Sequence, residues 1–89
     1  MDFQKEEGRI YLEKDGKIIA EIEDEDLGNN NYNIFHTFVD ESLRGQGIAS
    51  KLVEMAIEEI KGKSNDANLV NINATCSYAK AWLERHKLV

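Results

Sequence analysis

The segment from Asp40 to Gly62 changes its hydrophobic period from that of a strand to that of a helix. Residues 32–40, YNIFHTFVD, are dense in aromatic and β-branched side chains, which is typical of a strand covered on both faces. Residues 48–62 instead carry apolar side chains at helical spacing and end on a glycine, where a helix C-cap is expected. The chain is therefore predicted to pass directly from a strand into an amphipathic helix.

A second short apolar run, residues 69–75, follows this helix after a polar loop. A strand, a helix and a strand joined by short connections predict a right-handed parallel crossover. The two glycines at the junction, Gly45 and Gly47, then lie at the carboxyl end of the first strand. There the unpaired N–H groups and the dipole of the helix favour an anion, and Arg44 adds a positive charge. A glycine-rich turn without a ligand is the alternative interpretation.

The remaining segments predict a small fold of the α/β (α+β) class. Residues 9–23 are predicted to form a hairpin that turns at Asp15-Gly16, because a short turn of this kind joins two runs of alternating apolar residues. Residues 77–89 are predicted to form a closing helix. We expect a single domain over residues 1–89, with a mixed sheet of about four strands and two helices.

The charge of the chain is acidic and unevenly placed. The formal net charge is −6, and residues 1–44 hold twelve acidic and five basic side chains. A surface that binds nucleic acid needs a basic footprint, so this charge argues against nucleic acid. The acidic segment, residues 21–31, is interpreted first as a solvated hairpin loop; the alternative is a field that attracts a cationic substrate. No apolar stretch is long enough for a membrane span. The single cysteine, Cys76, cannot form an internal disulfide, so we expect a reducing, cytoplasmic location.

Two familiar phosphate-binding motifs do not fit the pair of glycines. A Walker loop requires GxxxxGK[ST], which the sequence lacks. The dinucleotide fingerprint GxGxxG fails at its last position, where Ser50 stands. Asn73 also replaces the acidic residue that this fingerprint expects at the end of the next strand. A nucleotide-binding loop of either kind is therefore not predicted.

A third pattern does fit. RGQGIA, residues 44–49, resembles the [RQ]-x-x-G-x-[GA] signature of the GNAT superfamily of acetyl-CoA-dependent N-acetyltransferases. HTFVDESLRGQGIASKL and CSYAKAWLE, residues 36–52 and 76–84, are similar to a family of very small, truncated GNAT-like proteins. Members of that family carry a histidine in the strand before the loop and a cysteine at the start of the last helix. The resemblance covers roughly residues 9–86 in order.

The resemblance implies that acetyl-CoA is the cosubstrate. The strand that ends at Phe38 and Val39 is expected to offer backbone groups to the pantetheine arm. The N–H groups of residues 46–49 are expected to hold the pyrophosphate in a loop shaped by Arg44 and Gly45. The full set of expected contacts is Phe38, Val39, Arg44, Gly45, Gln46, Gly47, Ile48, Ala49, Ser50, Lys51, Ser77 and Lys80.

The usual acid–base pair of larger GNAT enzymes is missing from this sequence, because their general-acid tyrosine falls at Leu83 and their carboxylate base falls near Thr37. Cys76 could compensate. A thiol at a helix N-terminus has a lowered pKa and could take the acetyl group or protonate the departing thiolate. His36 could act as a base and Tyr78 as a donor to the thioester oxygen. A buried structural cysteine, a hydrogen-bonded core histidine and a packed helix tyrosine are the alternatives.

We therefore expect an N-acetyltransferase that moves acetyl from acetyl-CoA to an unknown amine, either a small molecule or a protein. Its catalytic candidates are Cys76, His36 and Tyr78. The alternative is a CoA- or acyl-CoA-binding module with little intrinsic activity that acts with a protein partner. No metal is expected, because the two histidines and one cysteine lack the clustered spacing of ligands. We expect a cytoplasmic monomer that contacts neither nucleic acid nor membrane.

Overall fold

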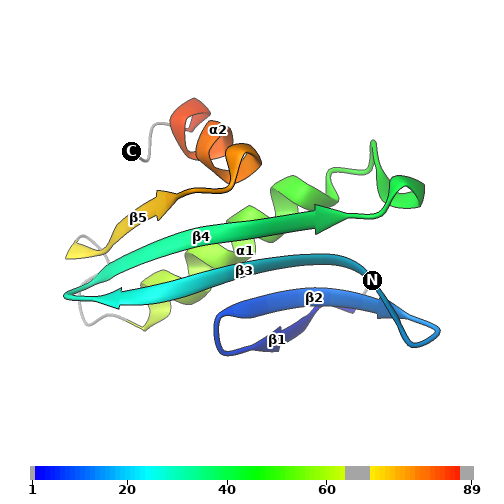
Figure 1. Ribbon diagram of the computed structural model, residues 1–89, viewed down its shortest axis with the longest axis horizontal. Helices are drawn as coiled ribbons and strands as arrows, with labels where there is room; N and C mark the ends of the chain where they lie inside the picture. The colour runs from blue at the N-terminus through cyan, green and yellow to red at the C-terminus, as the bar shows by residue number, and fades with distance from the viewer. Residues whose placement is uncertain (1, 64–68, 87–89) are drawn as a thin grey trace.

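The computed structural model describes residues 2–63 and 69–86 as one sheet with two α-helices (Figure 1). The sheet has five strands in the order β1-β2-β3-β4-β5, and all neighbours are antiparallel except β4 and β5. This confirms the predicted α/β (α+β) class. The elements are β1 (Gln4–Glu6), β2 (Arg9–Lys14), β3 (Lys17–Gly28), β4 (Asn31–Val39), the 3-10 helix η1 (Glu41–Leu43), α1 (Ile48–Gly62), β5 (Asn71–Ala74) and α2 (Ser77–Arg85).

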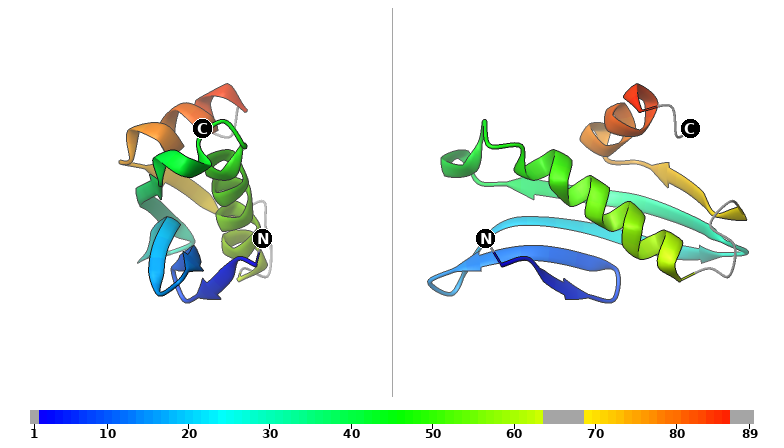
Figure 2. Two further views of the ribbon diagram at one scale, coloured as in Figure 1. Left: turned by 90° about the vertical axis from the view of Figure 1, so that its right-hand side faces the viewer. Right: turned by 180° about the vertical axis from the view of Figure 1, so that it is seen from behind.

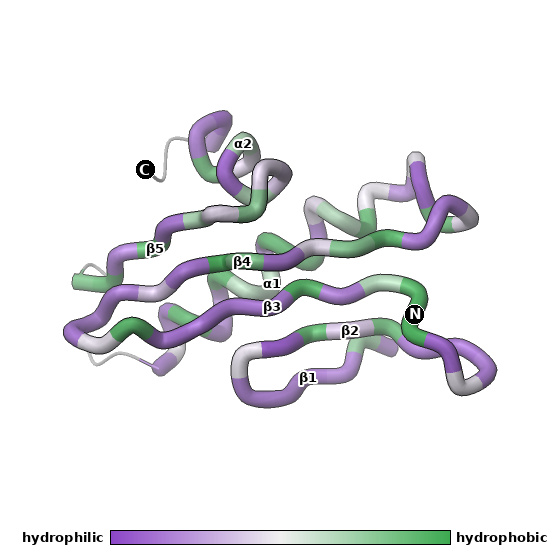
Figure 3. Tube along the Cα trace, viewed as in Figure 1, coloured by the Kyte–Doolittle hydropathy of each residue, from purple (hydrophilic) through white to green (hydrophobic). Residues whose placement is uncertain are grey.

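β1 is the strand that the sequence pattern did not predict. Its three residues, Gln-Lys-Glu, are all exposed, and the tube in Figure 3 is largely hydrophilic along this strand. No apolar alternation marks such a strand; its position depends on pairing with β2 and on an ion pair between Lys5 and Glu59 of α1, at 2.9 Å. The sheet therefore has five strands where about four were expected.

α1 covers one face of the sheet, and the other face of β2 and β3 carries no helix (Figure 2). The apolar stripe of α1 buries Leu52, Val53 and Ile60 completely, in one hydrophobic cluster with Ile22 and Ile34 of the sheet. Burial of each such side chain contributes about 1.5–3 kcal/mol to the free energy of folding. The apolar stripe therefore holds the helix against the sheet. In the part of the chain that the structure describes, no helix is long and apolar enough to cross a membrane.

A β-bulge at Phe35 reverses the alternation of side chains within β4. Ile34 pairs with Asp24, but His36 pairs with the adjacent Glu23, so Phe35 is the extra residue. Beyond the bulge, Thr37 lies opposite the buried Ile22 and therefore faces α1, whereas His36 faces the open side. The expectation that this strand is covered on both faces is wrong, because Phe35 and Phe38 are 44% and 39% exposed.

β4 and β5 part at the bulge. Their pairing ends at Ile34 and Ala74, and the backbone N–H groups of Thr75 and Cys76 both donate to the Ile34 carbonyl, at 3.1 and 3.3 Å. α2 then begins at Ser77 and leads the chain away from the edge of β4 (Figure 1). The carboxyl half of β4 is therefore left without a neighbouring strand on this side.

The free edge of β4 is formed by the backbone N–H and C=O groups of Thr37 and Val39. The backbone N–H of Asp40 donates to the Ile19 carbonyl of β3 at 2.8 Å, so Asp40 directs its backbone groups toward β3. Backbone groups alternate between the two sides of a strand. Phe38 therefore also bonds toward β3, and Thr37 and Val39 direct their N–H and C=O groups toward the gap that β5 leaves.

Candidate functional site

The first turn of α1 is an open cluster of backbone N–H groups. Gly47 is the N-cap residue, with a left-handed φ of 72°, and it provides no side-chain cap. The first helical bond runs from the Lys51 N–H to the Gly47 carbonyl at 3.0 Å. The amides of Ile48, Ala49 and Ser50 therefore point out of the helix end, as in sites that bind phosphate.

The two glycines of the loop keep the approach to these amides clear. Gly45 and Gly47 both have positive φ, 84° and 72°, which side chains other than that of glycine adopt at a cost. A Cβ placed on either glycine would meet no atom within 4 Å, so the space beside each backbone is empty. Glycine is required here by the backbone conformation, and it also leaves room for a ligand.

Asp40 sets the conformation of the chain just before the loop. Its carboxylate accepts hydrogen bonds from the Ser42 hydroxyl at 2.6 Å and from the Ser42 amide at 3.1 Å, and so caps η1. These two bonds hold the pKa of Asp40 below its ordinary value. The turn that carries the chain from β4 to Arg44 is therefore fixed by local hydrogen bonds.

A groove of about 380 Å³ runs from the free edge of β4 to this helix end. It is bounded by the end of β4, by η1, by the glycine loop, by the first turn of α1 and by the start of α2. Its lining residues are Thr37, Val39, Leu43, Arg44, Gly45, Gly47, Ile48, Ala49, Ser50 and Tyr78. Most of the glycine-loop residues that were expected to contact acetyl-CoA thus line one groove. Thr37 and Leu43 also line it, and they were not among the predicted contacts.

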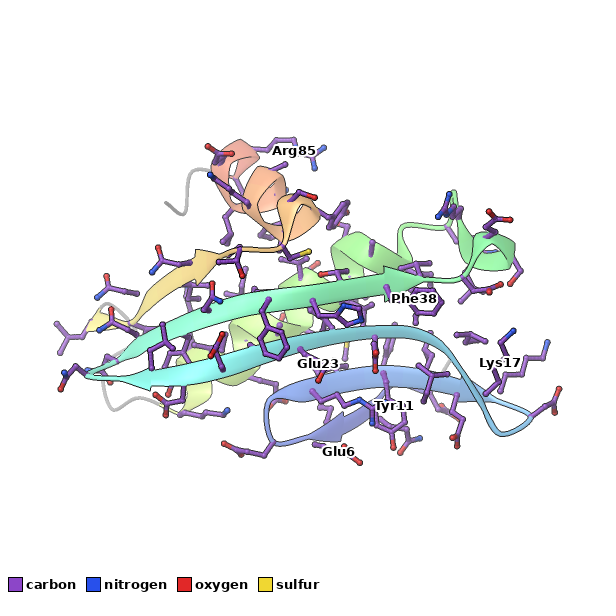
Figure 4. All side chains as sticks on the ribbon, viewed as in Figure 1. Glu6, Tyr11, Lys17, Glu23, Phe38 and Arg85 are labelled. Carbon is purple, nitrogen blue, oxygen red and sulfur yellow. The ribbon has the colours of Figure 1, made fainter. Side chains whose placement is uncertain are left out.

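Other expected contacts lie outside this groove. Phe38 is on the open face of the sheet, where its partner on β3 is Glu21 (Figure 4). The side chains of Gln46, Lys51, Ser77 and Lys80 are exposed around the loop and on the two helices.

Cys76 lies where β4 and β5 separate. It is the N-cap residue of α2, and its thiol donates to the Thr37 hydroxyl at 3.3 Å. Burial raises the pKa of this thiol, but hydrogen bonds outweigh burial and hold the pKa below its ordinary value. In the thiolate form the sulfur accepts these bonds, from the Thr37 hydroxyl, which then acts as the donor, and from the backbone amides of Ala79, Tyr78 and Thr37. Cys76 therefore ionises more readily than an ordinary thiol, and it lies next to Thr37 in the wall of the groove.

Ser50 connects the groove to the closing helix. Its hydroxyl accepts a hydrogen bond from the indole N–H of Trp82 at 2.8 Å. Trp82 is 6% exposed and stacks on His86, with the ring centroids 3.9 Å apart. Because the indole occupies one lone pair of the Ser50 oxygen, the hydroxyl hydrogen remains available to a ligand in the groove.

His36 belongs to a different set of contacts, on the open face of the sheet. Its Nε2 lies 3.2 Å from Oε1 of Glu21, and Arg9 binds the other oxygen of Glu21 through Nε and Nη2, at 3.0 and 2.9 Å. Tyr11 and Glu23 flank this set on the same face (Figure 4). The sequence did not indicate these partners, because they come from three strands and meet only through the register of the sheet.

The structure does not join His36 to Cys76. Thr37, the residue that binds the Cys76 thiol, faces α1, whereas His36 faces the open side of the same strand. The two catalytic candidates thus lie on either side of one short stretch of β4. Glu21, Glu23 and His36 also have potential metal-ligand atoms within 4.8 Å of one another; Oε2 of Glu21 is bonded to Arg9, and Oε1 lies 3.2 Å from His36 itself.

Comparison with known proteins identifies relatives of the whole chain. The model of the GCN5-related N-acetyl-transferase family matches residues 9–89. The solution structure of a GCN5-like protein from Staphylococcus aureus has a TM-score of 0.74 and is 32% identical, covering 98% of this chain and 81% of its own length. A search of curated proteins gives no match.

Two larger acetyltransferases share the fold at lower identity. The ribosomal-protein-S18-alanine N-acetyltransferase from Escherichia coli is 21% identical over 88% of this chain, with a TM-score of 0.63. A predicted acetyltransferase from Clostridium acetobutylicum, solved with acetyl-CoA, is 18% identical over 88% of this chain, with a TM-score of 0.62. The chain spans 50% and 55% of their lengths.

Proposed function

The chain belongs to the GCN5-related N-acetyltransferase family, and we propose that it transfers the acetyl group of acetyl-CoA to a primary amine through the thiol of Cys76. The observation that carries this proposal is the groove that links the open amides of α1 to the free edge of β4, where Thr37 lines the groove and its hydroxyl contacts the thiol of Cys76. Each part of that groove suits one part of acetyl-CoA.

The amides of Ile48, Ala49 and Ser50 are suited to the pyrophosphate. A helix N-terminus offers both N–H donors and a positive dipole end, and the glycines leave the backbone accessible. The Ser50 hydroxyl can donate one further bond, because Trp82 already supplies the bond that its oxygen accepts. Arg44 and the exposed Lys51 add positive charge beside the loop.

The edge of β4 is suited to the pantetheine arm. Thr37 and Val39 direct backbone groups into the gap left by β5, and an extended amide-containing ligand can pair with them as a strand would. This arrangement supports Val39, rather than Phe38, as the backbone contact at the end of the strand. A thioester at the far end of such an arm reaches the region of the bulge, beside Cys76.

Cys76 has the environment of a nucleophile. Its thiolate is stabilised by the Thr37 hydroxyl and by amides at the N-terminus of α2. In the proposed step the Cys76 sulfur attacks the thioester carbonyl carbon, a new C–S bond forms, and the C–S bond to CoA breaks. CoA leaves as a thiolate that takes a proton. The amine, as the free base, then attacks the carbonyl carbon of the acetyl-cysteine: an N–C bond forms, the C–S bond to Cys76 breaks, and the proton lost from the amine nitrogen goes to the Cys76 sulfur or to solvent. Tyr78 lines the groove, and we propose that its hydroxyl donates to the carbonyl oxygen.

The acceptor is proposed to be cationic. Glu21, Glu23 and Glu25 follow one another on the open face of β3, and this face is reached from solvent. Such a field attracts a protonated amine and repels nucleic acid. A reducing cytoplasm is the proposed location, because it preserves Cys76 as a free thiol.

Intact-mass spectrometry after incubation with acetyl-CoA tests this proposal. We expect a mass increase of one acetyl group that hydroxylamine removes, that Cys76→Ser abolishes, and that disappears when a lysine-containing peptide is added and becomes acetylated. Transfer at full rate by Cys76→Ser would contradict the covalent route and indicate direct attack by the amine. Binding of acetyl-CoA without transfer to any amine tested would instead indicate a CoA-binding module that acts with a protein partner.

A further inference from the structure

Asn33 bridges β4 and β5 immediately before the two strands part. Apart from aromatic residues, it is the one buried polar side chain in the part of the chain that the structure describes, with 8% exposed. We propose that Asn33 is a positioning residue, which acts through Thr75 to hold the start of α2, and with it the Cys76 thiol, against β4. This inference rests on the proposed function and goes beyond it, because it identifies what keeps the nucleophile in place.

The side-chain amide of Asn33 makes two hydrogen bonds. Nδ2 donates to Oε2 of Glu25 and to the hydroxyl of Thr75, at 3.1 Å in both cases. An amide nitrogen carries two hydrogens, so both bonds are present at once. Glu25 lies in β3, Asn33 lies in β4, and Thr75 directly follows β5. The amide therefore connects three neighbouring segments of the sheet.

Glu25 determines which end of the amide meets Thr75. It is the direct cross-strand partner of Asn33, so the two side chains share one face of the sheet. An ionised carboxylate only accepts hydrogen bonds, and this excludes the opposite orientation, in which the amide oxygen would face it. The amide nitrogen is thereby held toward Glu25, and its second hydrogen is directed to the Thr75 hydroxyl.

The backbone alone gives this part of the chain few links to β4. β5 is an edge strand of four residues, and its pairing with β4 ends at Ala74. Beyond that pair, the N–H groups of Thr75 and Cys76 share one acceptor, the Ile34 carbonyl, at 3.1 and 3.3 Å. The bond from Cys76 is longer than is usual for N–H···O. The bond from Asn33 to Thr75 adds a link at the residue directly before the nucleophile.

The surroundings of the Cys76 thiol depend on where α2 begins. The amides of Tyr78 and Ala79 move with the thiol, because they belong to the first turn of the same helix. The contacts with Thr37 do not, because Thr37 lies in β4, across the gap between the strands. A displacement of the chain at Thr75 therefore lengthens the contact between Cys76 and Thr37, and it leaves the contacts within the helix intact.

Asn33 acts on the thiol without entering the groove. Its side chain lies on the face of the sheet that carries Glu25, whereas Thr37 faces α1. Thr37 and Val39 are the residues of β4 that line the groove, and Asn33 is not among its lining residues. Loss of the Asn33 amide should therefore change the reactivity of the thiol but not the binding of CoA.

Alkylation of Cys76 by iodoacetamide, measured against pH in the full chain, tests the positioning without requiring acetyl transfer. Thr75→Val keeps the shape of the side chain and removes the acceptor, and Asn33→Ala removes the donor. We expect both variants to move the half-maximal rate to higher pH. Alkylation at neutral pH should slow by about threefold or more, the change that half a pKa unit produces.

Asn73→Ala is the matched control. Asn73 is the cross-strand partner of Asn33 on β5, and its side chain is exposed, so the variant removes an amide nearby without removing the bond to Thr75. Its alkylation rate should stay within about twofold of that of the unchanged protein. An unchanged profile in folded Thr75→Val, or an equal shift in Asn73→Ala, would overturn the proposal. Thr75→Val alone decides the matter if Asn33→Ala does not fold.

A double variant tests the route through Thr37. If the bond to Thr75 acts by holding Cys76 against Thr37, Thr75→Val should shift the profile less in a Thr37→Val background than in the unchanged protein. Equal shifts in both backgrounds would overturn this route.

Acetyl-CoA separates positioning from binding. Thr75→Val should form the hydroxylamine-labile acetyl-cysteine about threefold more slowly or less readily still, while its CoA affinity, measured by calorimetry, stays within about twofold. A loss of CoA affinity equal to the loss of acetylation rate would overturn the proposal. The expected alkylation profiles without acetyl-cysteine in the unchanged protein would overturn the proposed function while supporting the positioning.

Discussion

Thr37 and Cys76 are 39 positions apart in the sequence, and the thiol of Cys76 donates a hydrogen bond to the hydroxyl of Thr37 at 3.3 Å. This contact spans the point at which β4 and β5 separate. It joins the free edge of one strand to the N-terminus of the last helix, and so it connects the binding groove to the residue proposed to react.

Thr37→Val should make Cys76 less reactive at neutral pH. The Thr37 hydroxyl helps to hold the pKa of the thiol below its ordinary value, so its loss raises that pKa and reduces the thiolate fraction. A hydrogen bond of roughly 1 kcal/mol corresponds to about a fivefold slower reaction with iodoacetamide. Alkylation rates measured against pH should show the half-maximal rate moving to higher pH. Thr37→Ser, which keeps a hydroxyl, is the control, and an unchanged profile in Thr37→Val would refute the assignment.

Gly47→Ala should weaken CoA binding far more than it weakens the fold. A Cβ here enters the space beside the amides of α1, and it also occupies a positive φ, which costs about 1–2 kcal/mol of stability. Gly16→Ala is a matched control, since Gly16 has a φ of 77° and equally open surroundings in the β2–β3 turn, away from the groove.

Calorimetric titration with CoA and a thermal melt separate these two effects. Both variants should lose similar stability, but only Gly47→Ala should lose CoA affinity, by about tenfold or more, which is 1.4 kcal/mol. Equal CoA affinity in the two variants would show that the amides of α1 do not hold the pyrophosphate.

Ser50→Ala should destabilise the fold through Trp82. The indole N–H donates to the Ser50 hydroxyl at 2.8 Å, and Trp82 is 6% exposed, so the substitution leaves a buried donor without a partner. Such a donor costs about 1–3 kcal/mol. Urea unfolding of Ser50→Ala, Trp82→Phe and the double variant should show that the two losses are not additive, because one hydrogen bond is removed in all three. Additive losses would mean that this bond contributes little to stability.

Asp24→Asn should stabilise the protein at neutral pH. Burial raises the pKa of Asp24 above its ordinary value, with contributions from Glu7 and other acidic neighbours, and Lys63 only partly opposes this shift. The folded state therefore binds a proton more tightly than the unfolded state. The free energy of unfolding falls as pH rises from the pKa of Asp24 in the unfolded chain to its higher pKa in the folded protein. The gain in Asp24→Asn should be below about 1 kcal/mol, because solvent screens this half-exposed group. The gain should vanish in acid, and a gain that persists there would contradict this cause.

The main elements of the fold were predictable because their patterns are local. The helical period of residues 48–62 defines α1 as the structure has it, and the Asp15-Gly16 hairpin is formed by two residues with positive φ, 53° and 77°. β1 was not predictable, because three exposed polar residues carry no apolar alternation. Its place in the sheet depends on β2, which is tertiary information.

The candidate site also has features that the sequence indicates and features that it does not. The glycine loop was recognisable because backbone conformation constrains Gly45 and Gly47 directly. The bulge at Phe35 was not, because one extra residue in a strand leaves no mark on composition, although it changes which side chains face α1. The contact of His36 with Glu21 depends on that bulge and on the β3–β4 register, so no sequence spacing could indicate it.

The central claim is that acetyl-CoA binds between the first turn of α1 and the free edge of β4. A titration of the nitrogen-15-labelled chain with acetyl-CoA, followed by amide chemical shifts, tests it most directly. We predict progressive shifts of the amides of Ile48, Ala49 and Ser50, together with those of Thr37 and Val39. A second hollow of about 190 Å³ near the other end of α1 is lined by Lys5, Arg9 and Lys63 together with Glu6, Glu7, Asp24 and Glu59, so we expect no shifts there. Shifts confined to that hollow, or no shifts at saturating acetyl-CoA, would contradict the account.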